Sequence, residues 1–343
     1  MAQNTKNNSQ KKSTLASFKY KLQDRISLDD KEWKYQVPGL PSPQKLDEHR
    51  LVKTVSLINS ATKSEIVLSL EPTQDNRAIQ YDPLNKFVVV SLAEFKHIPQ
   101  QQLQNSMNSR DALQPITPRE CNDYAIRFLK AGIHIQGVHY NFYGHSNSQL
   151  KSRTCFLYAA SREQISHKVK SLGDFSSMKT VAKMAKRIGL LFSTARVAKV
   201  IPPDRVEDIP DIESPDGYVF TDGCGLISPH LAQDLARRLG IVFRDRRYTP
   251  SVLQIRYRGY KGVVTVDPRM TSDPRILLRM RKSMKKFSGG DDHSFSVVEY
   301  SKVLYAVYIG LVPSTDMVLS HSPTASSTMK SSSCSMRSEL TAR

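Results

Sequence analysis

A strongly basic segment rich in strand-forming residues constrains this chain more than any other feature. It runs from Gly217 to Pro268, begins with GYVFTDGCGLIS and ends with PSVLQIRYRGYKGVVTVDP. From Arg237 to Lys286 the chain has fifteen Lys and Arg against three Asp, which leaves a net charge of +12. A sheet-forming region with this much self-repulsion is typical of proteins that bind a polyanion, and phosphate backbones are the commonest one. The sequence therefore predicts a nucleic-acid partner.

The composition is that of a folded protein of about two domains. The chain has 343 residues, a formal net charge of +18 and 39% apolar residues, which is enough to build a core. No segment reaches the roughly 18 to 20 consecutive apolar residues of a membrane span, and the polar start lacks the apolar centre of a signal peptide. We therefore expect a soluble intracellular protein, cytoplasmic or nuclear, with no membrane partner. The four cysteines form no C-x-x-C pair, so neither a disulfide framework nor a zinc site is predicted.

Composition divides the chain into five segments. Residues 1–14 are polar and cannot offset the entropy of ordering, so a disordered tail is expected. An acidic linker follows Pro202 and Pro203, where we place a domain boundary between a mixed α/β N-terminal region and the basic region. After Val312 the apolar periodicity ends, and ten serines up to Arg343 predict a Ser-rich disordered tail. The predicted segments are 1–14, 15–203, 204–216, 217–312 and 313–343.

Strands and helices are predicted from apolar periodicity and from capping residues. The polar stretch 97–114 predicts a surface loop, and RGYK between the last two strands predicts a turn. The predicted strands are 65–70, 87–92, 133–143, 154–160, 217–221, 253–257 and 262–266.

The clearest helix signal is a capping box at Thr117, where Pro118 suits the first helical position, Glu120 completes the box and Gly132 ends the helix. The core face of this helix is expected to comprise Ala125, Ile126, Leu129 and Phe128.

Another helix is predicted to begin at Ser228. Its core face is expected to comprise Leu231, Leu235 and Leu239.

Two further helices are predicted to carry basic outer faces. One begins near Ser176, and its other face carries Lys179, Lys183, Lys186 and Arg187. Its apolar stripe would be Met178, Val181, Ala182, Ala185 and Ile188. The other begins at Asp273 and Pro274. Its apolar stripe would be Ile276, Leu277, Met280, Met284 and Phe287.

Four ordered blocks resemble the eukaryotic RNA-dependent RNA polymerases of RNA silencing. They are AGIHIQGVHYNFYGHSNSQLKSRTCFLYAA, GYVFTDGCGLIS, QIRYRGYKGVVTVDP and RKSMKKF, and the resemblance covers roughly residues 115–300. It implies an α+β chain whose mixed N-terminal region precedes the first double-psi β-barrel of a two-barrel polymerase core. It also implies RNA-templated synthesis of complementary RNA, with a single-stranded RNA template, ribonucleoside triphosphates and small-RNA pathway proteins as partners.

The resemblance further implies Mg²⁺, held by a D-x-D-G-D loop of the second barrel, and this chain contains no such sequence. Two-metal nucleotidyl transfer needs several converging carboxylates. Asp222 offers a single carboxylate and is expected to cap a turn, and the pair Asp291 and Asp292 lacks a third. We therefore expect an incomplete polymerase core with no metal ligands of its own.

By the same resemblance, Lys261 and Lys285 are the residues that support catalysis, by contacting the phosphates of nucleotide or RNA. Fixed cations stabilise the charge that develops on a transferring phosphoryl group. For Lys285 the alternative is that Lys282 or Lys286 makes the phosphate contact. Arg256 and Arg258 are predicted to share one sheet face, which either lines an RNA channel or is merely solvated. The predicted RNA-binding residues are Arg256, Arg258, Arg275, Arg279, Lys282, Lys286, Lys151 and Arg153.

Two rival interpretations stay open at this point. The chain is either a non-catalytic RNA-binding protein, or a truncated polymerase remnant whose serine-rich end comes from a shifted frame or a retained intron. The first predicts RNA binding that weakens steeply with salt. No P-loop, H-E-x-x-H, G-x-S-x-G or dinucleotide fingerprint occurs in the sequence, so the usual competing enzyme classes have no support.

Overall fold

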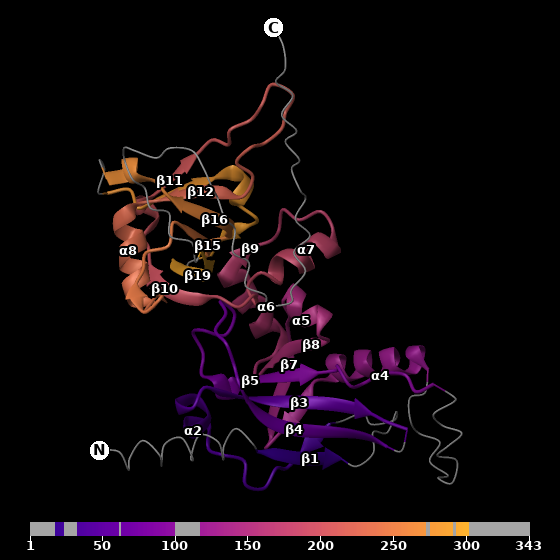
Figure 1. Ribbon diagram of the computed structural model, residues 1–343. Coiled ribbons are helices and arrows are strands. Elements are labelled where there is room, and N and C mark those ends of the chain that lie inside the picture. The colour runs from indigo at the N-terminus through magenta and orange to yellow at the C-terminus, as the bar shows by residue number, and fades with distance from the viewer. Residues whose placement is uncertain are drawn as a thin grey trace, which may run out of the picture. The chain divides into compact units, whose positions relative to one another are not determined.

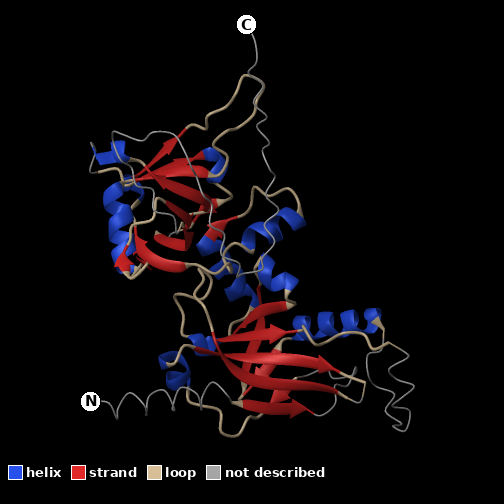
Figure 2. Cartoon of the chain, in the orientation of Figure 1, coloured by secondary structure: helices blue, strands red, loops and turns tan. Residues whose placement is uncertain are grey.

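Two β-sheets form the framework of the described chain (Figure 2). The computed structural model describes residues 18–23, 33–61, 63–99, 117–271, 275–290 and 293–301, which belong to one compact unit. The predicted tails at 1–14 and 313–343 and most of the predicted loop at 97–114 lie outside these residues.

The first sheet has eight strands in the order β1-β4-β3-β5-β8-β7-β6-β2. Its strands β1, β4, β3 and β5 follow one another in Figure 1. β3 and β4 pair antiparallel along their whole length, and β3 is parallel to β5. The predicted strands at 65–70, 87–92 and 154–160 are thus confirmed. The bounds are β1 Lys19–Gln23, β2 Lys34–Tyr35, β3 Leu51–Asn59, β4 Ser64–Pro72, β5 Phe87–Ser91, β6 Ile133–Ile135, β7 Val138–Gly144 and β8 Thr154–Tyr158.

The segment predicted as one strand over 133–143 is a hairpin made of β6 and β7. Gln136 and Gly137 both have positive φ, at 54° and 76°. Two such residues make the tight turn whose twist suits paired strands. The sequence signal for this turn is Gln-Gly between two apolar runs. The prediction of a single strand over 133–143 overlooks it.

Helix α4 (Pro118–Ala131) packs its aromatic face on this sheet. The predicted capping box is confirmed, since Thr117 Oγ1 accepts from the Glu120 N–H at 3.2 Å and the Thr117 N–H donates to Glu120 Oε2 at 2.9 Å. The predicted core face is only partly right, because Tyr124 and Phe128 are fully buried while Ile126 is 50% exposed. The Trp33 indole N–H donates to the Tyr124 hydroxyl at 3.0 Å, and this contact turns the aromatic stripe towards the sheet.

Three short helices follow, each capped by a serine or threonine: α5 (Asn147–Lys151), α6 (Arg162–Leu172) and α7 (Val181–Ile188). Neither α5 nor α6 was predicted. The prediction of the basic helix near Ser176 is wrong in start and stripe, because α7 begins after Thr180 and Val181 is 78% exposed. Only Met184 and Ile188 of α7 pack on buried residues. A remaining helix, α2 (Pro43–Glu48), buries Leu46.

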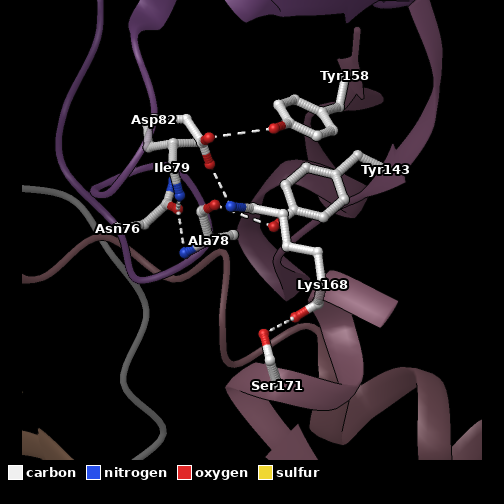
Figure 3. Close-up of polar contacts among 8 residues, drawn as sticks. All are labelled: Asn76, Ala78, Ile79, Asp82, Tyr143, Tyr158, Lys168 and Ser171. Atoms are coloured by element: carbon white, nitrogen blue, oxygen red, sulfur yellow. Dashed lines mark hydrogen bonds and ion pairs between the residues drawn. The ribbon is translucent and has the colours of Figure 1, made fainter. Parts of the chain in front are cut away.

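The loop between β4 and β5 is fixed to α6 by a partly buried ion pair (Figure 3). Lys168 of α6 pairs with the Asp82 carboxylate, and the Tyr158 hydroxyl donates to the same carboxylate at 3.1 Å. The Lys168 ammonium also lies 5.5 Å from the Tyr158 ring centroid. These contacts tie the loop, α6 and β8 together.

The same loop is held to the segment after α7 by its backbone. Asn76 Oδ1 accepts from the Ala78 N–H at 3.0 Å, and the Tyr143 hydroxyl donates to the Ala78 carbonyl at 2.9 Å (Figure 3). The Ala78 N–H then donates to the Leu191 carbonyl at 3.1 Å, and the Ala195 N–H donates to the Asp75 carbonyl at 3.0 Å. Residues 190–195 are therefore positioned by the first sheet.

The second sheet has seven strands in the order β10-β19-β15-β16-β12-β17-β11 and is curled into a nearly closed barrel-like form. It is mixed, because β12 is parallel to β16 and β11 is parallel to β17 while the other neighbours are antiparallel. The predicted strands at 253–257 and 262–266 are confirmed. The bounds are β10 Arg196–Val200, β11 Val206–Ile209, β12 Cys224–Ile227, β15 Val252–Tyr257, β16 Tyr260–Val266, β17 Leu278–Arg281 and β19 Ser294–Tyr300.

Helix α8 (Pro229–Arg238) has Ser228 as its N-cap and buries Leu231 and Leu235 in the core of the second sheet, as predicted, whereas Leu239 is only partly buried. Two further strand pairs are short: β13 (Val242–Phe243) with β14 (Arg246–Arg247), and β9 (Gly173–Asp174) with β18 (Ser288–Gly289). The strands β10 and β11 lie on either side of Pro202 and Pro203, and both belong to this sheet. Within the described ranges, no helix has the length and apolarity needed to cross a membrane.

Two sequence-based assignments in this region are wrong. Residues 217–221 form a turn with one bridge between Glu213 and Val219, because Gly217 has φ 84° and its N–H donates to the Ser214 carbonyl. The helix predicted to begin at Asp273 and Pro274, with Phe287 as its last apolar residue, is replaced by β17 and a 3₁₀ turn (Lys282–Met284). Its start lies outside the described residues. Pairing of β17 with both β11 and β12 overrides the helical period.

Candidate phosphate-binding cleft

The β15–β16 hairpin places Arg256 and Lys261 directly opposite each other. The register pairs Arg256 with Lys261 and Tyr257 with Tyr260, so the two cations lie on one face of the hairpin. Arg258 and Gly259 form the two-residue turn with φ of 42° and 85°. Arg258 therefore does not continue the strand alternation that predicted it on the same face as Arg256.

The turn packs closely against the SMKKF segment. A Cβ placed on Gly259 would lie 2.0 Å from the Phe287 carbonyl oxygen, so only glycine fits this position. The Lys286 N–H donates to the Gly259 carbonyl at 2.9 Å. Together these contacts fix Lys286 beside the hairpin.

Arg256 and Lys261 line a small cavity together with Arg77 and the hydroxyls of Ser193, Ser294 and Ser296. Among the described residues that line it, none carries a carboxylate. Its volume of about 20 Å³ is about the space of one water molecule. The cavity can therefore accept a single ligand oxygen, and a larger anion would bind at its mouth.

The surroundings of Lys261 are positively charged. Burial lowers the pKa of Lys261, and the charges of Arg256, Lys186, Lys286 and Arg187 lower it further. Burial lowers the pKa of Arg256 to about 10. We call these five residues, Lys186, Arg187, Arg256, Lys261 and Lys286, the basic cluster.

Arg256 is poorly satisfied by the protein itself. Its Nη1 donates to the Ile255 carbonyl at 2.8 Å. Its Nε is buried and has no hydrogen-bond partner in the described part of the chain. A buried donor left without a partner costs about 1–3 kcal/mol, which an anionic ligand would recover.

Lys285 lies in a different environment from Lys261. Its Nζ is 5.4 Å from the centroid of the Tyr260 ring, and the Tyr260 hydroxyl donates to Asp208 at 2.6 Å. Since Tyr260 and Lys261 are consecutive strand residues, their side chains point to opposite faces. The structure thus brings Lys286, and not Lys285, into the surroundings of Lys261.

The remaining predicted RNA-binding residues lie in other surroundings in the described part of the chain. Arg279 Nε forms an ion pair with Glu207 at 2.7 Å. Arg275 and Lys282 are exposed, and the Arg275 carbonyl accepts from Arg205 Nε. Lys151 ends α5, and the exposed Arg153 follows it.

Sequence reasoning missed three cations near Lys261. Arg77 comes from the β4–β5 loop, and Lys186 and Arg187 come from the last turn of α7. The basic face of this helix was visible in the sequence. No local signal shows that it lies near the β15–β16 hairpin, because that proximity joins residues far apart in the chain.

The carboxylates of this region support loops. Asp211 accepts from the Ser283 N–H at 3.0 Å, from the Ser283 hydroxyl at 2.6 Å and from the Thr221 hydroxyl at 3.1 Å, which lowers its pKa despite partial burial. Asp222, predicted to cap a turn, is exposed.

No group of three or more His, Cys, Asp or Glu side chains converges within the described ranges. Asp291 and Asp292 lie outside them. The described residues therefore do not fit a divalent cation.

A family model described as RNA dependent RNA polymerase matches residues 61–311. The chain belongs to this family. The resemblance to the eukaryotic polymerases of RNA silencing is thereby confirmed at the level of the family.

Relatives of the chain come from plants and fungi. The RNA-dependent RNA polymerase 1 of Arabidopsis thaliana is 38% identical over 178 residues, which cover 51% of this chain and 15% of that protein. The RNA-dependent RNA polymerase 1 of Schizosaccharomyces pombe is 29% identical over 164 residues, which cover 47% of this chain and 13% of that protein. The matched part is thus less than a quarter of the length of these relatives.

A solved structure shares the fold. The RNA dependent RNA polymerase QDE-1 from Thielavia terrestris superposes with a TM-score of 0.54 at 18% identity, over 73% of this chain and 28% of that chain. At this identity the likeness concerns the fold alone.

Proposed function

We propose that this chain is part of an RNA-directed RNA polymerase of the RNA-silencing type and that its basic cluster contacts phosphates. The ligands would be the single-stranded RNA template or the incoming ribonucleoside triphosphates. One observation carries the proposal: Arg256 and Lys261 are paired in register on a rigid hairpin, partly buried, with no carboxylate lining the cavity beside them.

The chemistry of phosphoryl transfer explains why such an arrangement would be useful. Charge that develops on the transferring group is stabilised by cations already fixed in position, especially where water is excluded. Lys261 supplies a compact point charge and Arg256 a planar group that can donate two hydrogen bonds to one phosphate. The cations of the basic cluster repel one another when no anion is bound. Binding of an anion reduces this repulsion and is therefore favoured.

We further propose that the seven-stranded sheet is the first double-psi β-barrel of a two-barrel core. In that arrangement the Mg²⁺ ligands come from a D-x-D-G-D loop of the second barrel, which these 343 residues do not contain. Small-RNA pathway proteins would act on the duplex product. Lys285, held over Tyr260, would act from the other face of β16.

The test is RNA binding by the full chain, measured by fluorescence anisotropy with a short single-stranded RNA. Arg256→Ala with Lys261→Ala should weaken binding by roughly a hundredfold or more, because each of the two contacts to a charged group contributes about 1.5–3 kcal/mol. Lys130→Ala, which removes an exposed cation on α4, is the matched control. Equal affinities of the double variant and the control would refute the role of the hairpin.

A second function is a non-catalytic RNA-binding protein, either a dedicated one or a remnant of a polymerase. It is favoured by the absence of a converging carboxylate group within the described residues. Both functions predict RNA binding, and only the first predicts incorporation of labelled nucleotide when the chain is supplied with a second barrel. Incorporation by the purified chain alone, lost in Lys261→Ala, would show that the metal ligands lie within this polypeptide.

A further inference from the structure

The hairpin is only one wall of the cleft. We propose that the last turn of α7 forms the opposite wall, and that Lys186 and Arg187 bind phosphate groups directly, together with Arg256 and Lys261. This inference rests on the proposed function, since it names a second set of contacts for the same ligand. The ligand class is a run of adjacent phosphates, which both an RNA backbone and a nucleoside triphosphate provide.

The end of α7 is fixed at the cleft by backbone contacts. Residues Leu190 and Leu191, which follow the helix, line the cavity beside Arg256. The Leu191 N–H donates to the Ile188 carbonyl at 2.9 Å, and the Leu191 carbonyl accepts from Ala78 of the β4–β5 loop. That loop is itself held by Asp82 and Lys168 (Figure 3). The last turn therefore has a set position relative to the cavity.

The charges of α7 and of the hairpin act on each other. Lys186 and Arg187 are both among the cations that disfavour the charged form of Lys261. Arg187 is partly buried, and its Nε lacks a hydrogen-bond partner in the described chain, as does that of Arg256. Two arginines from different parts of the chain thus keep unused donors beside one lysine.

Packing and helix electrostatics do not account for this arrangement. Within α7 no residue is fully buried, so the helix adds little to the core. Cations in the last turn of a helix are favoured by the helix dipole, by about 0.3–1 kcal/mol. That effect would be obtained with the cations pointing to solvent, and it gives no reason for them to lie close to Lys261. A phosphate ligand gives such a reason.

The experiment uses the full chain and compares two charge changes on the same helix. Lys186→Gln with Arg187→Gln removes the proposed contacts, whereas Lys183→Gln removes an exposed cation of the first turn of α7. Affinity for a short single-stranded RNA is measured between about 50 and 200 mM salt. Parallel titrations with ATP separate binding of an RNA backbone from binding of a triphosphate.

We expect the double variant to bind RNA roughly tenfold more weakly and its log–log salt slope to fall by about 1.4, since each contact with single-stranded RNA contributes about 0.7. Lys183→Gln should leave the slope unchanged. A parallel loss of ATP affinity identifies a triphosphate among the ligands, and loss for RNA alone identifies the backbone; both results support the contact. A second readout is the reactivity of the Lys261 amine towards an acylating reagent, which should decrease in the double variant because two repelling charges are gone.

The outcomes separate this inference from the proposed function. If Arg256→Ala with Lys261→Ala weakens RNA binding but the α7 double variant behaves like Lys183→Gln, the hairpin binds phosphate and α7 does not. If neither double variant weakens binding, both proposals fail. Circular dichroism and thermal melting establish that each variant is folded.

Discussion

Each of the two sheets holds a basic side chain against its core, and the two differ in what surrounds them. Lys53 of β3 is 5% exposed; its Nζ donates to the Asn85 carbonyl at 2.7 Å and lies 4.9 Å from the Tyr140 ring centroid. Arg256 of β15 has a buried Nε without a partner in the described chain, and other cations lie close by. The fold supplies a hydrogen-bond acceptor to the Lys53 ammonium, and within the described chain it supplies none to Arg256 Nε.

The difference in hydrogen-bond partners indicates that Lys53 has a structural role and that Arg256 is available to bind a ligand. A buried cation that has a carbonyl acceptor, an aromatic face and a nearby acid recovers part of the cost of its burial. Asp47 supplies that acid for Lys53, although burial still lowers the pKa of Lys53. Buried cations gathered without an acid destabilise the free protein and are relieved only by an anion. Substitutions in the two sheets should therefore affect stability and RNA binding in different proportions.

The largest effect is expected from the hairpin turn of the second sheet. Gly259→Ala should destabilise the chain by about 4 kcal/mol, near the upper end for single substitutions, because the added Cβ meets the Phe287 carbonyl and the backbone has a positive φ. The matched control is Gly137→Ala in the first sheet, whose φ of 76° is similar and whose Cβ would meet nothing within 4 Å. It should cost about 1 kcal/mol. Chemical denaturation measures both, and equal losses would mean that the close contact at Phe287 is unimportant.

The next effect is a pH dependence carried by Lys53. Burial lowers the pKa of Lys53 from 10.5 to about 8, so between pH 8 and 10.5 the unfolded chain binds a proton that the folded chain does not. Stability due to this group must then rise with pH in that window. Relative to Lys53→Met, the wild-type chain should gain about 3 kcal/mol in the free energy of unfolding across it. A constant difference between the two chains from pH 7 to 10.5 would show that Lys53 titrates normally.

Local signals predicted much of the fold. The capping box at Thr117, the N-cap at Ser228 and the RGYK turn depend on residues a few positions apart. The two caps are present in the structure, and the turn is present but shorter than predicted, because Tyr260 and Lys261 already belong to β16. The helix predicted after Asp273 is wrong for the opposite reason, because its structure depends on residues far apart in the chain. Its apolar residues suit a helical period, but β17 is a strand because it fits between β11 and β12, which are distant in sequence.

The residues of the candidate cleft divide in the same way, into those that a local sequence signal could place and those that it could not. Lys261 and Arg256 were predicted from the motif around the turn, and their register pairing follows from that turn. Lys186, Arg187 and Arg77 could not be placed, since they come from segments positioned by the first sheet. The choice between Lys285 and Lys286 likewise depends on which side of β16 each side chain occupies, and no local pattern contains that information.

A smaller effect of opposite sign separates the two buried cations further. Arg256→Met removes a poorly solvated charge and its repulsion with Lys261, so the free chain should gain about 1–2 kcal/mol in stability while RNA affinity falls. Thermal melting and anisotropy on the same sample measure the two quantities. In Lys53→Met, RNA affinity should stay unchanged. Loss of RNA binding in both variants would mean that the contrast between the sheets is wrong.

The smallest effect concerns the caps of two helices. Thr117→Ala removes the capping box of α4, whose Tyr124 and Phe128 belong to the hydrophobic core of the first sheet. This substitution should cost about 1 kcal/mol of stability and leave RNA affinity unchanged. Thr180→Ala removes the N-cap of α7, where Thr180 Oγ1 accepts from the Lys183 N–H at 3.3 Å.

Because no residue of α7 is fully buried, fraying of this helix should cost little global stability. RNA affinity should nevertheless fall a few-fold, since Lys186 and Arg187 would lose their fixed position. Hydrogen exchange of the α7 amides reports the fraying directly. If those amides exchange faster in Thr180→Ala while RNA affinity is unchanged, the helix does not hold phosphate; if both change together, the order of α7 is required for binding.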